Sequence, residues 1–402
     1  MRILIHTERY LPTMEAVAIR MDVIANQLRE LGHQVTVITG NKPRSGKSAC
    51  GREGVIYAPT VQLRKKTNLL RLLNNVSFSF SSVFCSMGVG KCDVVITTSP
   101  PPLVSISGWL IAKMKGAKLV YDVRDIWPDV ALEMGSFSED SFFCRFFRWI
   151  TSFMYRKADL ITTVSPGKVI NLRKKLDNNS RSKVWLIANG YDLRNDVEPR
   201  DESAVDRYEL RDRFTCVYIG NLGYAQGLES LLEIAANTRH KNIQFLIFGN
   251  GVERETLERK TKERGLNQVR FCGNLPHEQV AAVLTHAKIS YIPLKNGKMK
   301  DSVPTKLYES LAMGCPVLLA ASGDSANILD ETGFGLSVSP DCTEAIVAKF
   351  DEMVEHYDLI YRKREAAMQI IREKHSRQSA VLELERLLQR LVLPEMKGEV
   401  LL

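Results

Sequence analysis

The chain has 402 residues, of which 45% are hydrophobic and 25% charged, a balance that is ordinary for a protein that folds in water. This length exceeds one typical hydrophobic core, so we expect two α/β domains of about 200 residues each. The eight cysteines form no C-x-x-C pair and no metal-ligand spacing, which favours reduced thiols and a protein without a metal or other cofactor.

The charge is unevenly distributed along the chain. Residues 1–190 hold 27 Lys and Arg against 14 Asp and Glu, whereas the remaining residues hold 28 against 32. A basic half predicts an anionic partner, either nucleic acid or a phospholipid surface. No helix-turn-helix, zinc or RNP pattern accompanies the charge, so we expect no nucleic-acid partner. No apolar run is long enough to span a bilayer and no signal-peptide pattern opens the chain, so a cytoplasmic protein is expected.

The first half begins with alternating strand and helix patterns. Residues 2–7 and 34–39 have the apolar, β-branched composition of strands, and apolar residues recur at helical spacing between them. Further buried strands are expected at 93–98 and 118–123. This alternation predicts a parallel sheet, whose ligands lie at the carboxyl ends of its strands.

Two segments of this half have the composition of elements that lie at a membrane surface. In residues 64–88 three successive cations precede an apolar stretch, and in residues 142–157 aromatic side chains stand beside Arg145 and Arg148. A core helix with a basic cap remains the alternative for the first segment, and a helix between sheet and solvent for the second. The basic charge of the same half favours a membrane-surface role for both.

The second half repeats the alternation of strands and helices. Residues 193–213 are polar and charged, which is typical of a linker. A strand follows at 215–220, and its Gly-containing loop NLGYAQG leads into a helix. A strand, turn and helix start of this kind bind anions through backbone N–H groups. Later strands are expected at 269–275 and 289–293.

The most informative stretch is residues 301–320, DSVPTKLYESLAMGCPVLLA. Pro304 suits a first helical turn, apolar residues follow at helical spacing, and a Gly-x-Pro turn ends the helix before a buried strand. The N–H groups at the helix start, with Thr305 and Lys306 beside them, suit an anion. An ordinary helix and strand of a parallel sheet is the alternative interpretation.

Asp301 and Glu309 are separated by seven residues, and with the Gly-x-Pro-Val turn this pattern resembles the retaining GT-B glycosyltransferases of family 4. The resemblance extends over nearly the whole chain. It implies an α/β fold of two Rossmann-like domains that face each other across a cleft. Residues 1–190 would be a membrane-facing, acceptor-binding domain and residues 191–375 a nucleotide-sugar donor domain. Residues 376–402 would be a C-terminal helix and tail that cross back to the first domain.

The resemblance also implies site residues. Glu309 would bind the ribose of the donor, Asp301 the sugar hydroxyls, and Lys306 the diphosphate. The implied catalytic residues are Asp301, Glu309, Arg124 and Asp125. The implied donor-binding residues are Gly220, Asn221, Gln226, Asn274, Leu275, Pro304, Thr305, Lys306 and Glu309. No metal ligands are implied.

Two departures from the family pattern concern the diphosphate. The Gly-Gly pair of the first loop is replaced by Met14-Glu15-Ala16, for which Arg9 or Arg20 is the expected substitute. Gln226 stands where a Lys usually neutralises the diphosphate, and a neutral amide supplies no charge. Diphosphate binding is therefore expected to depend most on Lys306.

A third departure is Arg124, which takes the place of a His. Because Arg does not act as a base at physiological pH, we assign it to phosphate binding. Asp125 or Asp122 is then the better candidate to activate an acceptor hydroxyl. An Asp125 that pairs with Arg124, or that caps the next helix, is the structural alternative.

The predicted function is sugar transfer from a UDP-sugar to a polyprenyl-diphosphate-linked acceptor, at the inner face of the cytoplasmic membrane, in O-antigen or capsule synthesis. Resemblance to transferases of N-acetyl-L-fucosamine and similar 6-deoxy amino sugars indicates the class of sugar. One alternative is a UDP-sugar 2-epimerase of the same fold, for which His6 is the well-placed acid–base candidate. Another is a non-catalytic subunit that binds nucleotide sugars.

Overall fold

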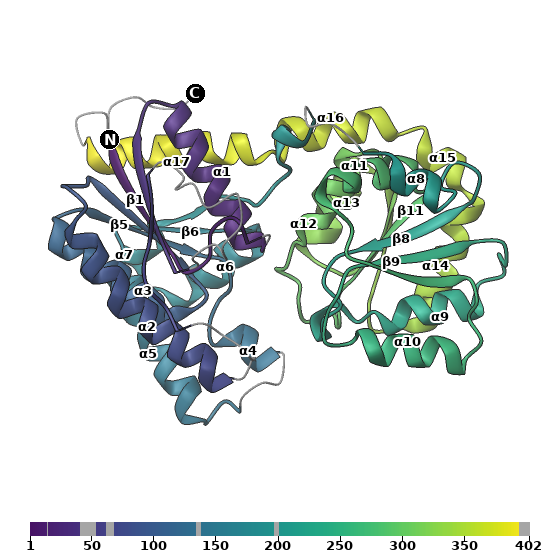
Figure 1. The fold of residues 1–402 in the computed structure, drawn as a ribbon, viewed down its shortest axis with the longest axis horizontal. Coiled ribbons are helices and arrows are strands. Elements are labelled where there is room, and N and C mark those ends of the chain that lie inside the picture. The colour runs from purple at the N-terminus through teal and green to yellow at the C-terminus, as the bar shows by residue number, and fades with distance from the viewer. Residues whose placement is uncertain (14, 41–53, 62–67, 134–137, 197–200, 394–402) are drawn as a thin grey trace. The chain divides into compact units, whose positions relative to one another are not determined.

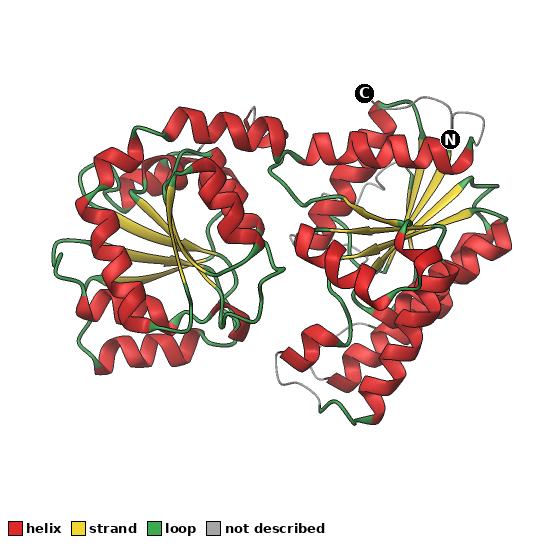
Figure 2. Ribbon diagram, turned by 180° about the vertical axis from the view of Figure 1, so that it is seen from behind, coloured by secondary structure: helices red, strands yellow, loops and turns green. Residues whose placement is uncertain are grey.

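The computed structural model describes residues 1–402 except 14, 41–53, 62–67, 134–137, 197–200 and 394–402 (Figure 1). The chain divides into two compact units: unit 1 is Met1–Asn189 with Gln378–Leu402, and unit 2 is Gly190–Arg377. Each unit is a parallel sheet with helices on both faces, as Figure 2 shows. The predicted α/β class with two Rossmann-like domains is confirmed.

Unit 1 contains a seven-stranded sheet with the order β3-β2-β1-β4-β5-β6-β7. The strands are β1 (Arg2–Thr7), β2 (Gln34–Thr39), β3 (Val55–Tyr57), β4 (Val94–Ser99), β5 (Lys118–Val123), β6 (Leu160–Thr163) and β7 (Val184–Leu186). All neighbours are parallel, and His6 of β1 pairs with Ile38 of β2 and Thr97 of β4. The strand order reverses between β1 and β4, so their carboxyl ends form the topological switch point where ligands of such sheets bind.

Two hydrophobic cores lie on the two faces of this sheet. One core packs against α2 (Asn68–Met87), α3 (Pro102–Lys115), α5 (Phe142–Lys157) and α6 (Pro166–Lys175). The other packs against α1 (Ala16–Glu30) and α17 (Arg377–Val392). Val381, Leu384 and Leu388 of α17 are buried in this second core. The last helix that the structure describes therefore belongs to the core of unit 1. Short helices α4 (Asp129–Glu133) and α7 (Asn178–Arg181) complete the unit.

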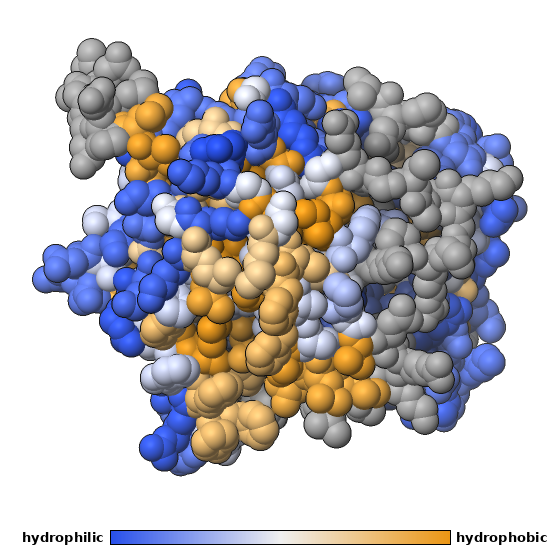
Figure 3. All heavy atoms as spheres, turned by 60° about the vertical axis from the view of Figure 1, so that its left-hand side comes forward, coloured by the Kyte–Doolittle hydropathy of each residue, from blue (hydrophilic) through white to orange (hydrophobic). Residues whose placement is uncertain are grey.

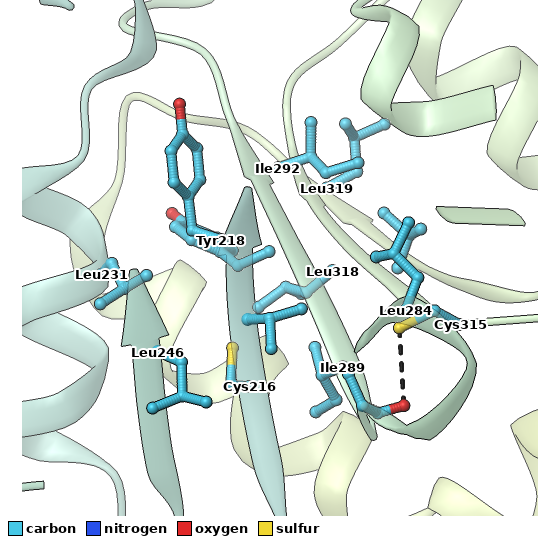
Figure 4. Packing of buried hydrophobic residues seen from close by; sticks show 14 of the residues in the cluster. Cys216, Tyr218, Leu231, Leu246, Leu284, Ile289, Ile292, Cys315, Leu318 and Leu319 are labelled. Atoms are coloured by element: carbon cyan, nitrogen blue, oxygen red, sulfur yellow. Dashed lines mark hydrogen bonds between the residues drawn. The ribbon is translucent and has the colours of Figure 1, made fainter. Parts of the chain in front are cut away.

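Unit 2 contains a six-stranded parallel sheet with the order β10-β9-β8-β11-β12-β13. The strands are β8 (Thr215–Ile219), β9 (Gln244–Phe248), β10 (Val269–Gly273), β11 (Ile289–Pro293), β12 (Val317–Ala320) and β13 (Gly335–Val338). Buried side chains such as Cys216, Leu246 and Leu318 pack along these strands, as Figure 4 shows. Here the order reverses between β8 and β11, which places the switch point of unit 2 at their carboxyl ends.

The helices of unit 2 cover both faces of its sheet. They are η1 (Leu193–Asp196), α8 (Ser203–Arg207), η2 (Tyr224–Gln226), α9 (Glu229–Asn237), α10 (Arg254–Glu263), α11 (His277–His286), α12 (Thr305–Ala312), α13 (Asp324–Thr332), α14 (Thr343–Glu355), α15 (Tyr357–Tyr361) and α16 (Arg364–Lys374). Within the described residues, the linker prediction for 193–213 is wrong, because Ala204, Val205 and Leu210 are fully buried in the core of unit 2. These few apolar residues among many charged ones give no periodic pattern.

The two chain segments that join the units run parallel to each other. Tyr191 N donates to His375 O at 2.7 Å and Arg377 N donates to Tyr191 O at 2.8 Å. Gly190 has φ +55°, and a Cβ there would lie 2.5 Å from His375 O. Glycine is therefore required where these two segments approach each other.

Candidate active site

Lys306 occupies the switch point of unit 2, in the first turn of α12. Its Nζ donates to Tyr218 Oη at 2.9 Å and to Gln226 Oε1 at 3.0 Å, and it lies 4.1 Å from the centre of the Tyr218 ring. Figure 4 shows the Tyr218 hydroxyl pointing away from the apolar side chains, at the carboxyl end of β8. Pro304 is the N-cap of α12 with an extended backbone, so it precedes the first turn in which we expected it.

The electrostatics of Lys306 are unusual for a surface lysine. Burial lowers the pKa of its ammonium to about 7, although the nearby Glu309 carboxylate acts to raise it. Burial also raises the pKa of the Tyr218 phenol, which is therefore neutral. Among the described residues Lys306 forms no salt bridge, and its two hydrogen-bond partners are neutral. The ammonium thus has room for an anionic partner that the protein itself does not provide.

Glycines keep this switch point free of side chains. Gly220 has φ +153°, and a Cβ there would lie 3.0 Å from Lys306 Nζ. A Cβ on Gly249 would lie 1.8 Å from Gly220 O, so the loops after β8 and β9 are in direct backbone contact. Tyr218 Oη donates to Asn221 O at 2.7 Å. Four predicted residues, Gly220, Asn221, Gln226 and Lys306, are therefore brought together.

The other predicted residues of unit 2 lie along the same carboxyl edge. Thr305 begins α12 and Glu309 lies one turn after it, close enough to Lys306 to affect its pKa. Asp301 is half-buried in the turn before α12. Asn274 is exposed and Leu275 half-buried directly after β10. The strand β9 separates β10 from β8, so this last pair lies at the far end of the edge.

Tyr218 is a site residue that sequence reasoning missed. It lies second to last in a strand that reads as an ordinary buried segment. Its position two residues before Gly220 was the available signal, because side chains at a strand end reach the carboxyl edge.

In unit 1, Asp122 holds a buried ion pair. Its carboxylate accepts from Arg20 Nη2 at 2.8 Å, Thr162 Oγ1 at 2.8 Å and Thr98 Oγ1 at 3.2 Å. Burial alone would raise the pKa of this carboxyl, but the Arg20 charge and the hydrogen bonds outweigh it and hold the pKa below its usual value. Arg20 also donates to Asn189 Oδ1 at 3.2 Å. Both residues are structural, so Asp122 as a base and Arg20 as a phosphate ligand are wrong.

Arg124 is half-buried at the carboxyl end of β5. Its Nε donates to Thr98 Oγ1 at 3.0 Å and its Nη2 donates to Pro100 O at 2.7 Å, which fixes the plane of the guanidinium. The half-buried Asp125 carboxylate forms no hydrogen bond or ion pair with described residues, although its charge acts on Arg124. Asp125 therefore differs from Asp122, three residues earlier in β5, whose carboxylate is held by an ion pair and hydrogen bonds.

Glu8 is a second residue that sequence reasoning missed. It is buried directly after β1, and its carboxylate lies 3.3 Å from Arg9 Nη2. Burial raises the pKa of the Glu8 carboxyl, while the charges of Arg9 and Arg124 lower it and that of Glu15 raises it further. Arg9 is thus paired with a carboxylate of the protein. The signal available in the sequence was an acid placed directly after a strand at the switch point.

His6 is part of the core of unit 1. Its ring stacks on Phe78 with 5.0 Å between centroids, and its two nitrogens lie 3.1 Å from Thr97 Oγ1 and 3.0 Å from Ser82 Oγ. Burial lowers the pKa of His6 to about 3, so the ring is neutral. It has no access to a substrate and does not provide acid–base chemistry.

Two family models match the chain. Residues 16–190 match a glycosyl transferase 4-like domain, and residues 201–373 match the glycosyl transferases group 1. The chain is therefore a glycosyltransferase, with a 4-like domain in its first half and a group 1 domain in its second. Its two family domains correspond closely to the two sheets described above.

Relatives and solved structures agree with this family. The chain is similar to the probable glycosyltransferase WbjE of Pseudomonas aeruginosa, with 25% identity over 65% of this chain and 66% of that protein. It is also similar to the putative colanic acid biosynthesis glycosyl transferase WcaI of Escherichia coli (strain K12), with 26% identity over 87% of this chain and 91% of that protein.

The similar solved structures show the GT-B fold. Sucrose-phosphate synthase from Thermosynechococcus elongatus has a TM-score of 0.78 at 17% identity, covering 97% of this chain and 98% of that one. Anabaena HepE in complex with UDP-glucose has a TM-score of 0.74 at 14% identity, covering 97% and 99%. WaaG, a glycosyltransferase involved in lipopolysaccharide biosynthesis, has a TM-score of 0.68 at 15% identity, covering 99% and 100%.

One face of unit 1 in this glycosyltransferase is apolar. We call it the apolar face; it includes the exposed side chains Phe80, Phe84, Met87, Met114, Phe142, Phe143, Phe146 and Trp149, from α2, α3 and α5. Figure 3 shows hydrophobic side chains gathered on this side of unit 1. The α5 rings stack successively, with 6.2 Å between Phe142 and Phe146 and 6.4 Å between Phe146 and Trp149.

The polar surroundings of this face are partly described. Arg148 pairs with Glu139 at 3.6 Å, and Lys113 lies 5.5 Å over the Trp109 ring. The predicted basic run at residues 64–66 lies outside the described residues.

Across the helices that the structure describes, none is long and apolar enough to span a membrane. The described His, Cys, Asp and Glu residues form no cluster able to hold a metal ion.

Proposed function

We propose that the protein transfers a sugar from a UDP-sugar to a polyprenyl-diphosphate-linked sugar, at the inner face of the cytoplasmic membrane, in surface polysaccharide synthesis. The sugar is N-acetyl-L-fucosamine or a similar 6-deoxy amino sugar. The name of WcaI refers to colanic acid biosynthesis and that of WaaG to lipopolysaccharide biosynthesis, and both support the polysaccharide context. The UDP-glucose complex of HepE supports the choice of donor.

The observation that carries the proposal is the Lys306 ammonium, held by two neutral groups at the switch point of unit 2. A diphosphate placed there meets this cation and the N–H groups at the start of α12. Departure of the nucleotide increases the negative charge on the diphosphate. A cation already oriented by Tyr218 and Gln226 stabilises that charge without reorganisation. Gln226 thus acts by positioning Lys306 rather than by binding phosphate directly.

The remaining residues take roles around this contact. Glu309 accepts the ribose hydroxyls of the donor, and Asp301 accepts the hydroxyls of its sugar. Asn274 and Leu275 lie beside the base. In unit 1, Arg124 binds phosphate of the acceptor. The Asp125 carboxylate, which forms no hydrogen bond or ion pair with described residues, accepts the proton of the acceptor hydroxyl.

The apolar face supports a position on the membrane surface. Exposed aromatic side chains of α5 would enter the headgroup zone, while the arginines Arg145 and Arg148 on the same helix meet anionic lipid. An apolar surface shared by three helices is unusual for a protein that stays in water.

The proposal is tested by incubating the purified protein with a panel of UDP-sugars and GlcNAc-diphosphate-lipid, and following the product mass. The expected result is a lipid product heavier by one sugar residue, formed in quantity with one donor. Lys306→Ala and Glu309→Ala are expected to abolish it. Transfer at the wild-type rate in both variants would exclude this site, and no product with any donor would exclude the function.

A further inference from the structure

Helices α2 and α3 border an apolar groove on unit 1 with a volume of about 420 Å³. Its walls include Val76, Val83 and Phe84 of α2, and Leu103, Ile106 and Leu110 of α3. The spacing of these residues places them on one stripe of each helix. None of the described residues that line the groove is charged.

The groove begins next to the polar edge of the sheet. The helix α3 starts directly after the loop at the carboxyl end of β4, so Leu103 lies at the end of the groove nearest that edge. In the same loop, Pro100 O accepts from Arg124 Nη2 at 2.7 Å. From Leu103 to Leu110 the helix rises about 10 Å, away from that edge. The groove therefore runs from the Arg124 end of the sheet along the apolar face, to which its lining residues Phe80 and Phe84 belong.

The groove offers an occupant no free hydroxyl proton. Its two hydroxyl groups, on Ser79 and Ser107, donate to carbonyls of their own helices, Asn75 O at 2.8 Å and Val104 O at 2.7 Å. A peptide segment would bury backbone C=O groups there without a donor, which is unfavourable. A hydrocarbon chain carries no such groups.

Without an occupant the groove leaves large apolar side chains in water. Phe80 and Phe84, which line it, are 67% and 66% exposed. Covering side chains of this kind is favourable, because free energy is gained in proportion to the apolar area removed from water. The apolar lining of the groove, its extent along α3 and the polar group Arg124 near one end thus all match an amphiphile.

We propose that this groove binds the hydrocarbon chain of the lipid-linked acceptor, with its phosphates at the Arg124 end. The identity of the acceptor rests on the proposed function, whereas the groove itself is tested by binding alone. The chain lies along α2 and α3, so the enzyme holds its acceptor through the lipid as well as through the sugar.

The test is calorimetric titration with dimethylallyl, geranyl and farnesyl diphosphate, in the presence of saturating UDP to occupy the donor site. Inorganic diphosphate is the headgroup-only probe. We expect the affinity to rise about tenfold or more from the shortest to the longest chain, as burial of apolar surface requires. Equal affinity for all three prenyl diphosphates would overturn the proposal.

Two variants test whether the dependence of affinity on chain length arises in this groove. Val76→Trp and Ser79→Phe each fill the groove, and we expect them to remove the dependence on chain length without changing inorganic diphosphate binding. Met114→Trp, an exposed position on α3 outside the groove, is the matched control and should behave as wild type. Chain-length dependence that persists in both filling variants would place the chain elsewhere and contradict the proposal.

The outcome also separates this proposal from the proposed function. Chain-dependent binding without sugar transfer to any lipid would support the groove and contradict the function. Sugar transfer by an enzyme that binds all chain lengths equally would support the function and contradict the groove.

Discussion

Lys306 lies over the face of the Tyr218 ring, with its Nζ 4.1 Å from the ring centre and 2.9 Å from the hydroxyl. An aromatic face attracts a cation through its quadrupole, and the hydroxyl accepts one ammonium proton. Neither interaction neutralises the charge. The arrangement therefore orients an ammonium for an anion at some cost to the folded protein, since burial disfavours the charged form.

Replacement of Lys306 should lower the affinity for UDP without lowering the thermal stability of the protein. For Lys306→Met we expect UDP affinity to fall at least about tenfold, the range of a charge-assisted phosphate contact. The melting temperature should stay equal or rise, because a partly desolvated cation is removed. Titration calorimetry and thermal unfolding measure the two effects. Lys298→Met, an exposed lysine of the preceding loop, is the control and should change neither. Unchanged UDP affinity in Lys306→Met would remove this lysine from the site.

The pKa of Lys306 predicts how UDP binding depends on pH. In the free protein this pKa is lowered to about 7. A bound diphosphate favours the ammonium and raises the pKa, so full affinity is present below about pH 7 and is lost as pH rises toward the pKa of the complex. Between about pH 7.5 and 9 the association constant should fall by up to about tenfold per pH unit, with proton uptake on binding. Lys306→Arg stays charged and should give a flat profile. The same slope in that variant would show that another group titrates.

Replacement of the carboxylate by an amide should lower mainly the stability of the protein at Asp122 and mainly its activity at Asp125. Asp122→Asn leaves the buried Arg20 without its counter-ion, and we expect a loss of about 3–5 kcal/mol in the free energy of unfolding. Asp125→Asn should leave stability within about 0.5 kcal/mol of wild type, because that carboxylate has no hydrogen-bond or ion-pair partner among the described residues, while sugar transfer falls strongly. Urea unfolding and the transfer assay distinguish them. Equal stability losses would mean that the Asp125 side chain is structural as well.

Low pH should reduce the stability of unit 1, because protonation of Asp122 breaks its ion pair with Arg20. The folded-state pKa of Asp122 is below its usual value, so its contribution to stability is present above the usual carboxyl range and is lost as pH falls through the lowered pKa. Unfolding free energy measured from neutral to acidic pH should therefore fall less steeply in Arg20→Met/Asp122→Leu than in wild type. An unchanged slope would indicate that other carboxylates dominate acid unfolding.

Membrane attachment is expected to depend on α5. Phe142 and Trp149 are 76% and 58% exposed, and Phe142→Ser/Trp149→Ser should reduce flotation with anionic liposomes severalfold. Leu359→Ser removes a similarly exposed side chain from α15 of unit 2 and serves as the control. Undiminished flotation of the α5 variant would exclude this helix as the membrane contact.

The sequence predicted the fold class because the periodicity of strands and helices is local. It also placed Lys306 in the first turn of a helix, because a proline ahead of apolar residues at helical spacing is a local pattern. The role of Gln226 was not predictable: the sequence shows a missing charge, but only the structure shows that the amide orients the lysine. Likewise, Arg20 and Asp122 are far apart in the chain, so no spacing rule shows that they neutralise each other.

The central claim is that the donor diphosphate binds at Lys306. A crystal structure of the protein with a UDP-sugar tests it most directly. We predict diphosphate oxygens within hydrogen-bond distance of Lys306 Nζ and of the backbone N–H groups at the start of α12. A diphosphate bound elsewhere, with the contacts of Lys306 to Tyr218 and Gln226 unchanged, would contradict it.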